Sequence, residues 1–212
     1  MNKIMKTLNF KIALSLGLFF LLTSVYAQDK PDALKMYNSG QYKNAIEVCL
    51  SEIKDAPNNL DSYVVLTWAL VADGQYIEAL NWAEKSKSIS KFDPRILETE
   101  GQAYYHLGQN GEAIRCFETY VVYAPNGNRH SLVYYFLGEI YLRLKKFSHA
   151  DIAFSTAVRL EPNNAVWWSR LGYAREMSNE PSYALHAYQR ALDLNKNLVE
   201  AQDGRSRILS RM

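Results

Sequence analysis

A regular internal repeat is the feature that most constrains this chain. An alanine recurs at Ala45, Ala79, Ala113, Ala150 and Ala184, and only the step from Ala113 to Ala150 is longer than the others, by three positions. A Gly-Gln pair begins five positions before each of the first three alanines. Periods of this kind are typical of chains in which small structural units stack on their sequence neighbours. The sequence therefore predicts a linear array of similar units instead of one globular core.

Two further markers keep the same register. A glycine lies twelve positions before the third, fourth and fifth alanine, and a proline lies twelve positions after the first, third and fourth: Gly101, Gly138, Gly172, Pro57, Pro125 and Pro162. Between these markers, apolar residues recur with the period of a helix, as at Tyr63, Leu66 and Leu70. Each unit should hold two helices of about a dozen residues, stopped by proline. We expect the helices to cross closely where glycine faces alanine.

This pattern resembles the tetratricopeptide repeat family over almost the whole chain after residue 27. The fourth unit carries the fullest set of the family's marker residues, namely Tyr134, Leu137, Gly138, Tyr141, Ala150, Phe154, Ala157 and Pro162. The resemblance implies an all-α fold, a right-handed superhelical solenoid of helix-turn-helix repeats. It also implies a protein-binding module that is not an enzyme, with a concave face lined by the first helix of each repeat.

The markers divide the chain into five repeats and a cap. The expected repeats are residues 28–59, 60–93, 94–127, 131–164 and 165–197, and residues 198–212 form a C-terminal capping helix. The first helix of the first repeat should be short, because Asp29 and Asp32 replace apolar markers. The single longer step places three extra residues at 126–130, and Arg175 stands where an aromatic residue is usual. Asp93 should cap the helix that begins at Pro94.

Residues 1–27 read as a secretory signal peptide. Lys3, Lys6 and Lys11 precede an uncharged, mostly apolar run over residues 12–25, and Ala27 supplies a small residue at the expected cleavage site. The predicted location is therefore outside the cytoplasm, periplasmic or secreted. The alternative is an uncleaved N-terminal segment that retains the protein at the inner membrane. No further segment for integral membrane insertion is expected after cleavage.

Charge, cysteine and histidine positions and motifs argue against nucleic-acid binding, an intramolecular disulfide, and a metal or cofactor site. The formal charge of +2 becomes −1 once residues 1–27, with three lysines and no acidic residue, are removed. Composition therefore gives no support for nucleic-acid binding. Cys49 and Cys116 lie a whole repeat apart, so we expect no disulfide between them. The four histidines are never at metal-ligand spacing and no phosphate-binding loop is present, so no metal or cofactor is expected.

The first helices project an unusually aromatic face away from their hairpin partners. The residues that we predict to bind a partner on this concave face are Tyr37, Val64, Trp68, Glu98, Gln102, Tyr105, Tyr135, Glu139 and Tyr173. Tyrosine and tryptophan dominate binding energetics at protein interfaces. The alternative is that some of these aromatic residues pack against the adjacent repeat, since aromatic residues at helical spacing are often core.

The predicted partner is a protein or peptide with an apolar or aromatic segment, and Glu98 and Glu139 should favour a basic residue in it. Some family members grip a C-terminal carboxylate with Lys, Asn and Arg, but here only Lys30 and Arg95 approach such places. The predicted function is a scaffold or adaptor in the bacterial cell envelope. The alternative function is a structural envelope protein that self-assembles into homo-oligomers through its open repeat ends.

Overall fold

The computed structural model describes residues 31–211, so the predicted signal peptide lies outside the described residues. The described part of the chain is all-helical. Its helices are α2 Ala33–Asn38, α3 Tyr42–Asp55, α4 Leu60–Ala72, α5 Tyr76–Ser86, α6 Pro94–His106, α7 Asn110–Tyr123, α8 His130–Arg143, α9 Phe147–Leu160, α10 Ala165–Met177, α11 Pro181–Leu194 and α12 Val199–Leu209. All of them belong to one compact unit, Ala33–Met212.

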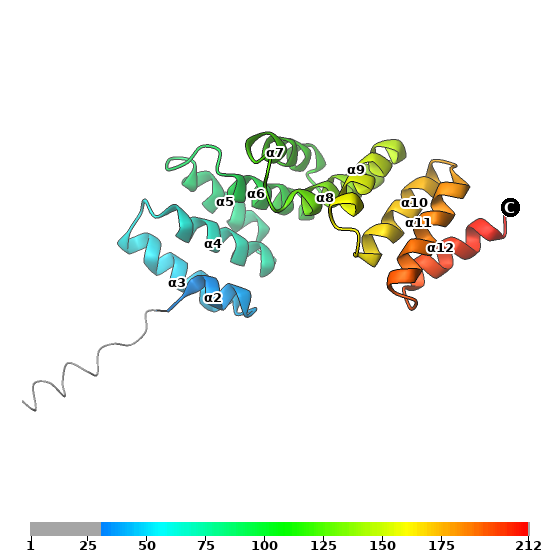
Figure 1. Cartoon of the computed structure of the whole chain (residues 1–212). Helices are drawn as coiled ribbons and strands as arrows, with labels where there is room; N and C mark the ends of the chain where they lie inside the picture. Colours follow the sequence, from blue (N-terminus) through cyan, green and yellow to red (C-terminus); the bar gives the residue numbers. More distant parts are fainter. Residues whose placement is uncertain (1–30, 212) are drawn as a thin grey trace, which may run out of the picture. The chain divides into compact units, whose positions relative to one another are not determined.

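The helices pack in sequence order, in antiparallel pairs (Figure 1). The pairs are α2 with α3, α4 with α5, α6 with α7, α8 with α9, and α10 with α11, and α12 packs on both α10 and α11. The first helices also contact one another across pairs, as α2 does with α4 and α4 with α6. The all-α solenoid predicted from the repeat is confirmed. The repeat boundaries given above remain predictions.

Backbone geometry explains the turn inside each pair. Gly40, Gly74 and Gly108 have φ angles of 77°, 81° and 74°, in the left-handed region that glycine enters most easily. Lys145 and Asn179 take the same place in the last two pairs, with φ angles of 56° and 61°. The turn therefore keeps its conformation even where the glycine is lost.

Caps and helix lengths agree with the sequence-based expectations. The Asp93 carboxylate accepts a hydrogen bond from the Arg95 backbone N–H, with Pro94 in the first turn of α6. The Asn164 side chain caps α10 through the Trp167 N–H. Helix α2 is short, at six residues. Both described cysteines are free. Over residues 31–211, no helix is long and apolar enough to span a bilayer.

An aromatic ring lies at the close crossing within a pair. The atoms nearest to the glycine of the first helix belong to the ring of an aromatic residue four positions beyond the repeat alanine, in the pairs Gly101–Phe117, Gly138–Phe154 and Gly172–Tyr188. A Cβ atom on Gly138 would lie 2.6–2.7 Å from three Phe154 ring carbons. The glycine is needed because the buried ring occupies the space that a side chain would take. The repeat alanines, such as Ala150, are fully buried beside it.

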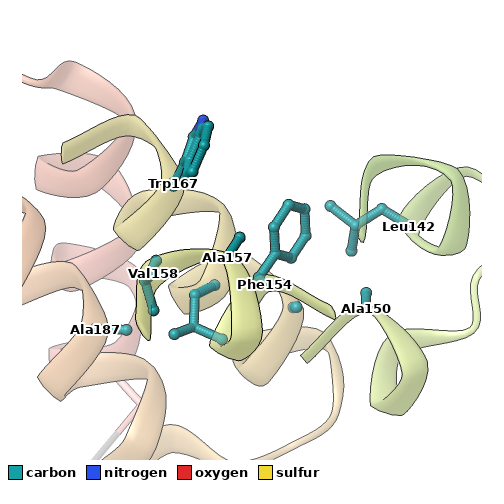
Figure 2. Packing of buried hydrophobic residues seen from close by; sticks show 9 residues of the cluster. Leu142, Ala150, Phe154, Ala157, Val158, Trp167 and Ala187 are labelled. Carbon is teal, nitrogen blue, oxygen red and sulfur yellow. The ribbon is translucent and has the colours of Figure 1, made fainter. Parts of the chain in front are cut away.

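These contacts continue from pair to pair. Phe154 and Val158 of α9, Leu142 of α8 and Trp167 of α10 belong to one buried cluster (Figure 2). Because each cluster joins a hairpin to the next first helix, the positions of successive first helices are fixed relative to one another. That placement decides which side chains can meet on the surface they share.

Candidate functional site

A cavity of about 550 Å³ lies along the first helices at the N-terminal end of the solenoid. It is formed by α2, α4 and α6 together with the end of α7 and the turn that leads to α8. Four residues of the predicted set line it, namely Tyr37, Trp68, Glu98 and Gln102. The other lining residues are Asn38, Val71, Ala72, Pro94, Arg95, Thr99, Tyr120, Ala124, Gly127, Asn128 and Arg129. We call this space the Trp68 cavity.

One wall of the Trp68 cavity is aromatic. The Tyr37 and Trp68 ring centroids are 5.7 Å apart with an interplanar angle of 39°. Both rings are half-buried, packed on one side against the core that α3 and α4 share. Partial burial holds the rings in place, so they would lose little conformational entropy when a ligand covers them.

The opposite wall depends on the three extra residues before α8. The Tyr120 hydroxyl accepts a hydrogen bond of 3.1 Å from the Arg129 backbone N–H, which holds this turn against α7. Gly127 lies against the Tyr120 hydroxyl, where a Cβ atom would clash. The Arg129 guanidinium thereby reaches α6, with its Nη2 atom 3.4 Å from Glu98 Oε1. Sequence reasoning located the insertion but did not predict that it supplies a side chain to the site.

The Glu98 carboxylate at the base of the cavity is almost completely buried, with 2% of the residue exposed. Gln102 Nε2 also donates a hydrogen bond to it. Burial raises the pKa of Glu98, and the nearby Arg129 charge offsets only part of this rise. That Glu98 favours a basic residue in a ligand stays a prediction, and the chain's own Arg129 already lies beside this carboxylate.

Arg95 at the cavity edge is also engaged. Its guanidinium binds Asp93 Oδ2 at 2.9 Å and Asp61 Oδ1 at 2.8 Å. Lys30, the other residue considered for a carboxylate clamp, lies outside the described residues. The described part of the chain thus has no unpaired arginine at the positions considered for such a clamp.

The remaining predicted residues do not line the Trp68 cavity. Val64 is 1% exposed and packs against Ala83 and Ile96, so it is not available to a ligand. Tyr105 lies beneath the Arg143 guanidinium, whose Cζ atom is 3.7 Å from the ring centroid. Both residues stabilise contacts between repeats. For Tyr105 this is what the alternative interpretation of the aromatic face expected.

Three predicted residues lie further along the solenoid. The Tyr135 ring stacks on Trp167 with centroids 5.3 Å apart, and burial raises its pKa to about 12. Glu139 accepts two hydrogen bonds from Arg170, of 2.5 and 2.7 Å, so it too is already paired. Tyr173 is partly buried against the clusters around α10. The structure therefore places these side chains in inter-repeat packing.

Glu98 and Glu139 belong to a series of acid–arginine pairs between successive first helices. The series comprises Asp61–Arg95, Glu98–Arg129, Glu139–Arg170 and Glu176–Arg207, whose partners are separated by nearly constant intervals along the chain. Each pair joins one first helix to the next first helix or to the residue just before it, or to α12 in the last case. The concave face is thus largely charge-neutralised by its own residues, which leaves aromatic and amide groups to make contacts.

Within residues 31–211, no three histidine, cysteine or acidic side chains lie close enough together to hold a metal ion. The arrangement in the Trp68 cavity offers ring faces, amide donors and acceptors, and neutralised charges. These are groups suited to holding a ligand rather than to transforming one.

Comparison with known proteins agrees with the helical repeat architecture. The family model described as tetratricopeptide repeat matches residues 132–164. The peroxisomal targeting signal receptor of Saccharomyces cerevisiae is 27% identical over 169 residues, 75% of this chain. The chain spans only 26% of that receptor's length.

Solved structures show the same fold. The Cut9–Hcn1 hetero-tetramer of APC/C is similar with a TM-score of 0.74 at 19% identity, over 84% of this chain and 35% of that chain. The first tetratricopeptide repeat domain of Spaghetti (RPAP3), bound to the HSP90 peptide SRMEEVD, gives a TM-score of 0.51 at 28% identity. That match covers 56% of this chain and 91% of the other.

Proposed function

Because this chain folds as tetratricopeptide repeats, we propose that it is an adaptor that holds a peptide segment of a partner protein in the Trp68 cavity. Peptide binding by a structural neighbour of the same fold supports this function. The observation that carries it is the cavity itself, a concave space of about 550 Å³ with a preformed aromatic wall.

The residues that line the Trp68 cavity determine which kind of peptide segment fits it. Tyr37, Trp68 and Val71 offer apolar surface, while the amides of Asn38 and Asn128 stand at the rim. A large apolar or aromatic side chain would cover the rings, and the amides would bind the backbone of an extended peptide. Since Glu98 and Arg129 neutralise each other, a strongly charged segment gains little here.

A photocrosslinker at Ala72 tests this proposal without removing any packing residue. Ala72 is exposed and lines the Trp68 cavity at the end of α4. With p-benzoylphenylalanine at position 72, irradiation of cells that produce the full chain should give a discrete crosslinked product, which mass spectrometry identifies. The matched control is the same residue at Ala56, which is also exposed but lies outside the cavity lining.

The two positions separate the possible outcomes. A product formed at position 72 and not at 56 supports the cavity as the binding site. Equal products at both positions, or none at 72, would contradict it. A product with twice the mass of the chain would instead support the alternative of a self-assembling protein.

We also propose that the adaptor works in the bacterial cell envelope, after export directed by residues 1–27. The support is the basic, apolar and small-residue order of this segment. N-terminal sequencing of the protein recovered from the envelope fraction should begin at Gln28. A full-length chain in the membrane fraction would favour the uncleaved inner-membrane alternative, and a full-length chain in the cytosol would contradict export.

A further inference from the structure

Besides the Trp68 cavity, two hollows lie between consecutive second helices. One hollow, of about 270 Å³, lies between α7 and α9 over α8, and the next, of about 780 Å³, lies between α9 and α11 over α10. Their lining residues are equivalent in the repeat: Tyr134, Leu137, Tyr141, His149 and Ile152 correspond to Trp168, Leu171, Arg175, Tyr183 and His186, each exactly one repeat later in the chain. The larger hollow is hereafter the Arg175 groove.

The substitution of arginine for the repeat aromatic distinguishes the Arg175 groove from its neighbour. Tyr141 belongs to the packing of the α7–α9 hollow, where its ring lies 5.3 Å from the His149 ring. Arg175 instead turns to α9, with Nε 2.9 Å from Asp151 Oδ1 and Nη2 3.1 Å from Ser155 Oγ. In the Arg175 groove, a guanidinium therefore stands at the position where the Tyr141 ring contributes to the packing of the α7–α9 hollow.

The charged residues that line the Arg175 groove are all basic. Arg159 and Arg175 line it, and no acidic residue does. Asp151, which lies outside the lining, forms an ion pair with Arg175. Over residues 31–211, Arg159 forms no ion pair, and the Nη1 atom of Arg175 has no hydrogen-bond acceptor. The groove therefore keeps one arginine, Arg159, with which no carboxylate of the described residues pairs, in contrast to the concave face.

The floor of the groove is apolar. The Trp168 Nε1 atom donates to the Pro162 carbonyl oxygen at 2.8 Å, so its polar atom is already bonded and the indole offers apolar surface. Leu171 and Val158 extend this surface, and Tyr183, which is 63% exposed, stands at the edge with its ring 5.8 Å from the Arg175 guanidinium carbon. An apolar floor with a cationic rim is complementary to a ligand that is both apolar and anionic.

We propose that the Arg175 groove is a second binding site, which takes an acidic peptide segment carrying one large apolar side chain. The apolar side chain lies on Trp168 and Leu171, and the carboxylates lie at Arg159 and Arg175. This site is independent of the Trp68 cavity. A chain with two such sites can hold two different segments at once, one neutral and one acidic.

Fluorescence anisotropy with a labelled peptide tests the site on the full chain. The probe is fluorescein-DEDFDED, with a peptide in which lysine replaces every acid and one in which alanine replaces the phenylalanine as controls. Arg175→Tyr restores the aromatic residue of the neighbouring repeat and should fill the groove, and Arg159→Glu reverses an exposed charge. Each variant should weaken binding of the acidic probe about tenfold or more.

The matched control is Arg205→Glu, which makes the same charge change at an exposed position on α12. Binding by this variant and by Ala72→Trp, which plugs the Trp68 cavity, should stay within about twofold of the parent chain. If Arg175→Tyr does not fold, as judged by its thermal unfolding, Arg159→Glu alone carries the test. Equal loss in Arg159→Glu and Arg205→Glu, equal binding of the lysine peptide, or no binding by the parent chain would each overturn the proposal.

Discussion

Replacing Glu176 by glutamine should lower the free energy of unfolding by about 2–3 kcal/mol at pH 7, whereas the same change at Glu98 should leave it unchanged or raise it by up to about 1 kcal/mol. The two side chains are similarly inaccessible, with 5% and 3% of their surface exposed. They differ in the number and kind of their partners, and Glu98 is the more deeply buried of the two residues.

Glu176 has a complete set of partners. Arg207 donates two hydrogen bonds to it, of 3.0 and 2.8 Å, and the Tyr188 hydroxyl donates another of 2.8 Å. Arg211 lies 3.4 Å away. Burial acts to raise the pKa of Glu176, but these donors outweigh it and the pKa lies below the usual value of 4.5. The ionised carboxylate therefore stabilises the packing of α12 on α10.

The cost of burying the Glu98 carboxylate is offset by fewer and weaker partners. Its arginine partner is at 3.4 Å and makes one contact, and its other donor is the neutral amide of Gln102. Burial dominates, so the pKa of Glu98 lies above the usual value. Glutamine keeps the shape of this side chain and removes the cost of burying its charge, and Arg129 remains partly solvated with 49% of its side chain exposed.

The contributions of Glu176 and Glu98 to the free energy of unfolding should change in opposite directions as the pH rises. The pKa of Glu176 is lowered in the fold, so its contribution is present above pH 4.5 and is lost as the pH falls toward the lower folded value. The pKa of Glu98 is raised, so the parent chain loses stability as the pH rises from 4.5 through the folded value. Urea unfolding of both variants between pH 4 and 8 measures this. Losses of equal sign and size at pH 7 would contradict the assignment of partners.

A methyl group at Gly138 should destabilise the chain by about 1–3 kcal/mol, although alanine is the better helix former by about 1 kcal/mol. The new Cβ atom would lie 2.6–2.7 Å from the ring of Phe154, which is fully buried between α8, α9 and α10 and has no room to withdraw. Thermal or urea unfolding of Gly138→Ala measures the loss.

Gly111→Ala is the matched control, because Gly111 is also within a helix and a Cβ atom there would meet no atom within 4 Å. This variant should be as stable as the parent or slightly more so. Combining Gly138→Ala with Phe154→Leu should cost less than the sum of the two single changes, because the smaller side chain makes room for the methyl group. Strict additivity would show that the ring is not what excludes the methyl group.

Local patterns were sufficient to predict the helices of this chain. The alanine, glycine and proline markers recur within one unit, so they report the short-range geometry of a hairpin. The turn at Gly108, the cap at Asp93 and the short first helix all follow from interactions between close sequence neighbours. The pattern aligned the small residues of each repeat but did not identify Phe154 as the side chain nearest to Gly138, because it carries no information on which ring fills the space between the helices.

The sequence by itself determined that the chain is an all-α array of paired helices, because the apolar period, the turn residues and the helix stops act within a single repeat. Only the tertiary structure decided which side chains of the first helices are available to a ligand. Tyr135 is stacked on Trp167 and Glu98 is paired with Arg129, and both partners come from the following unit or from the turn that leads to it. The aromatic and acidic positions are equivalent in the repeat, but contacts between neighbouring repeats bury or pair most of these side chains. Those contacts therefore determine which few remain accessible to a ligand.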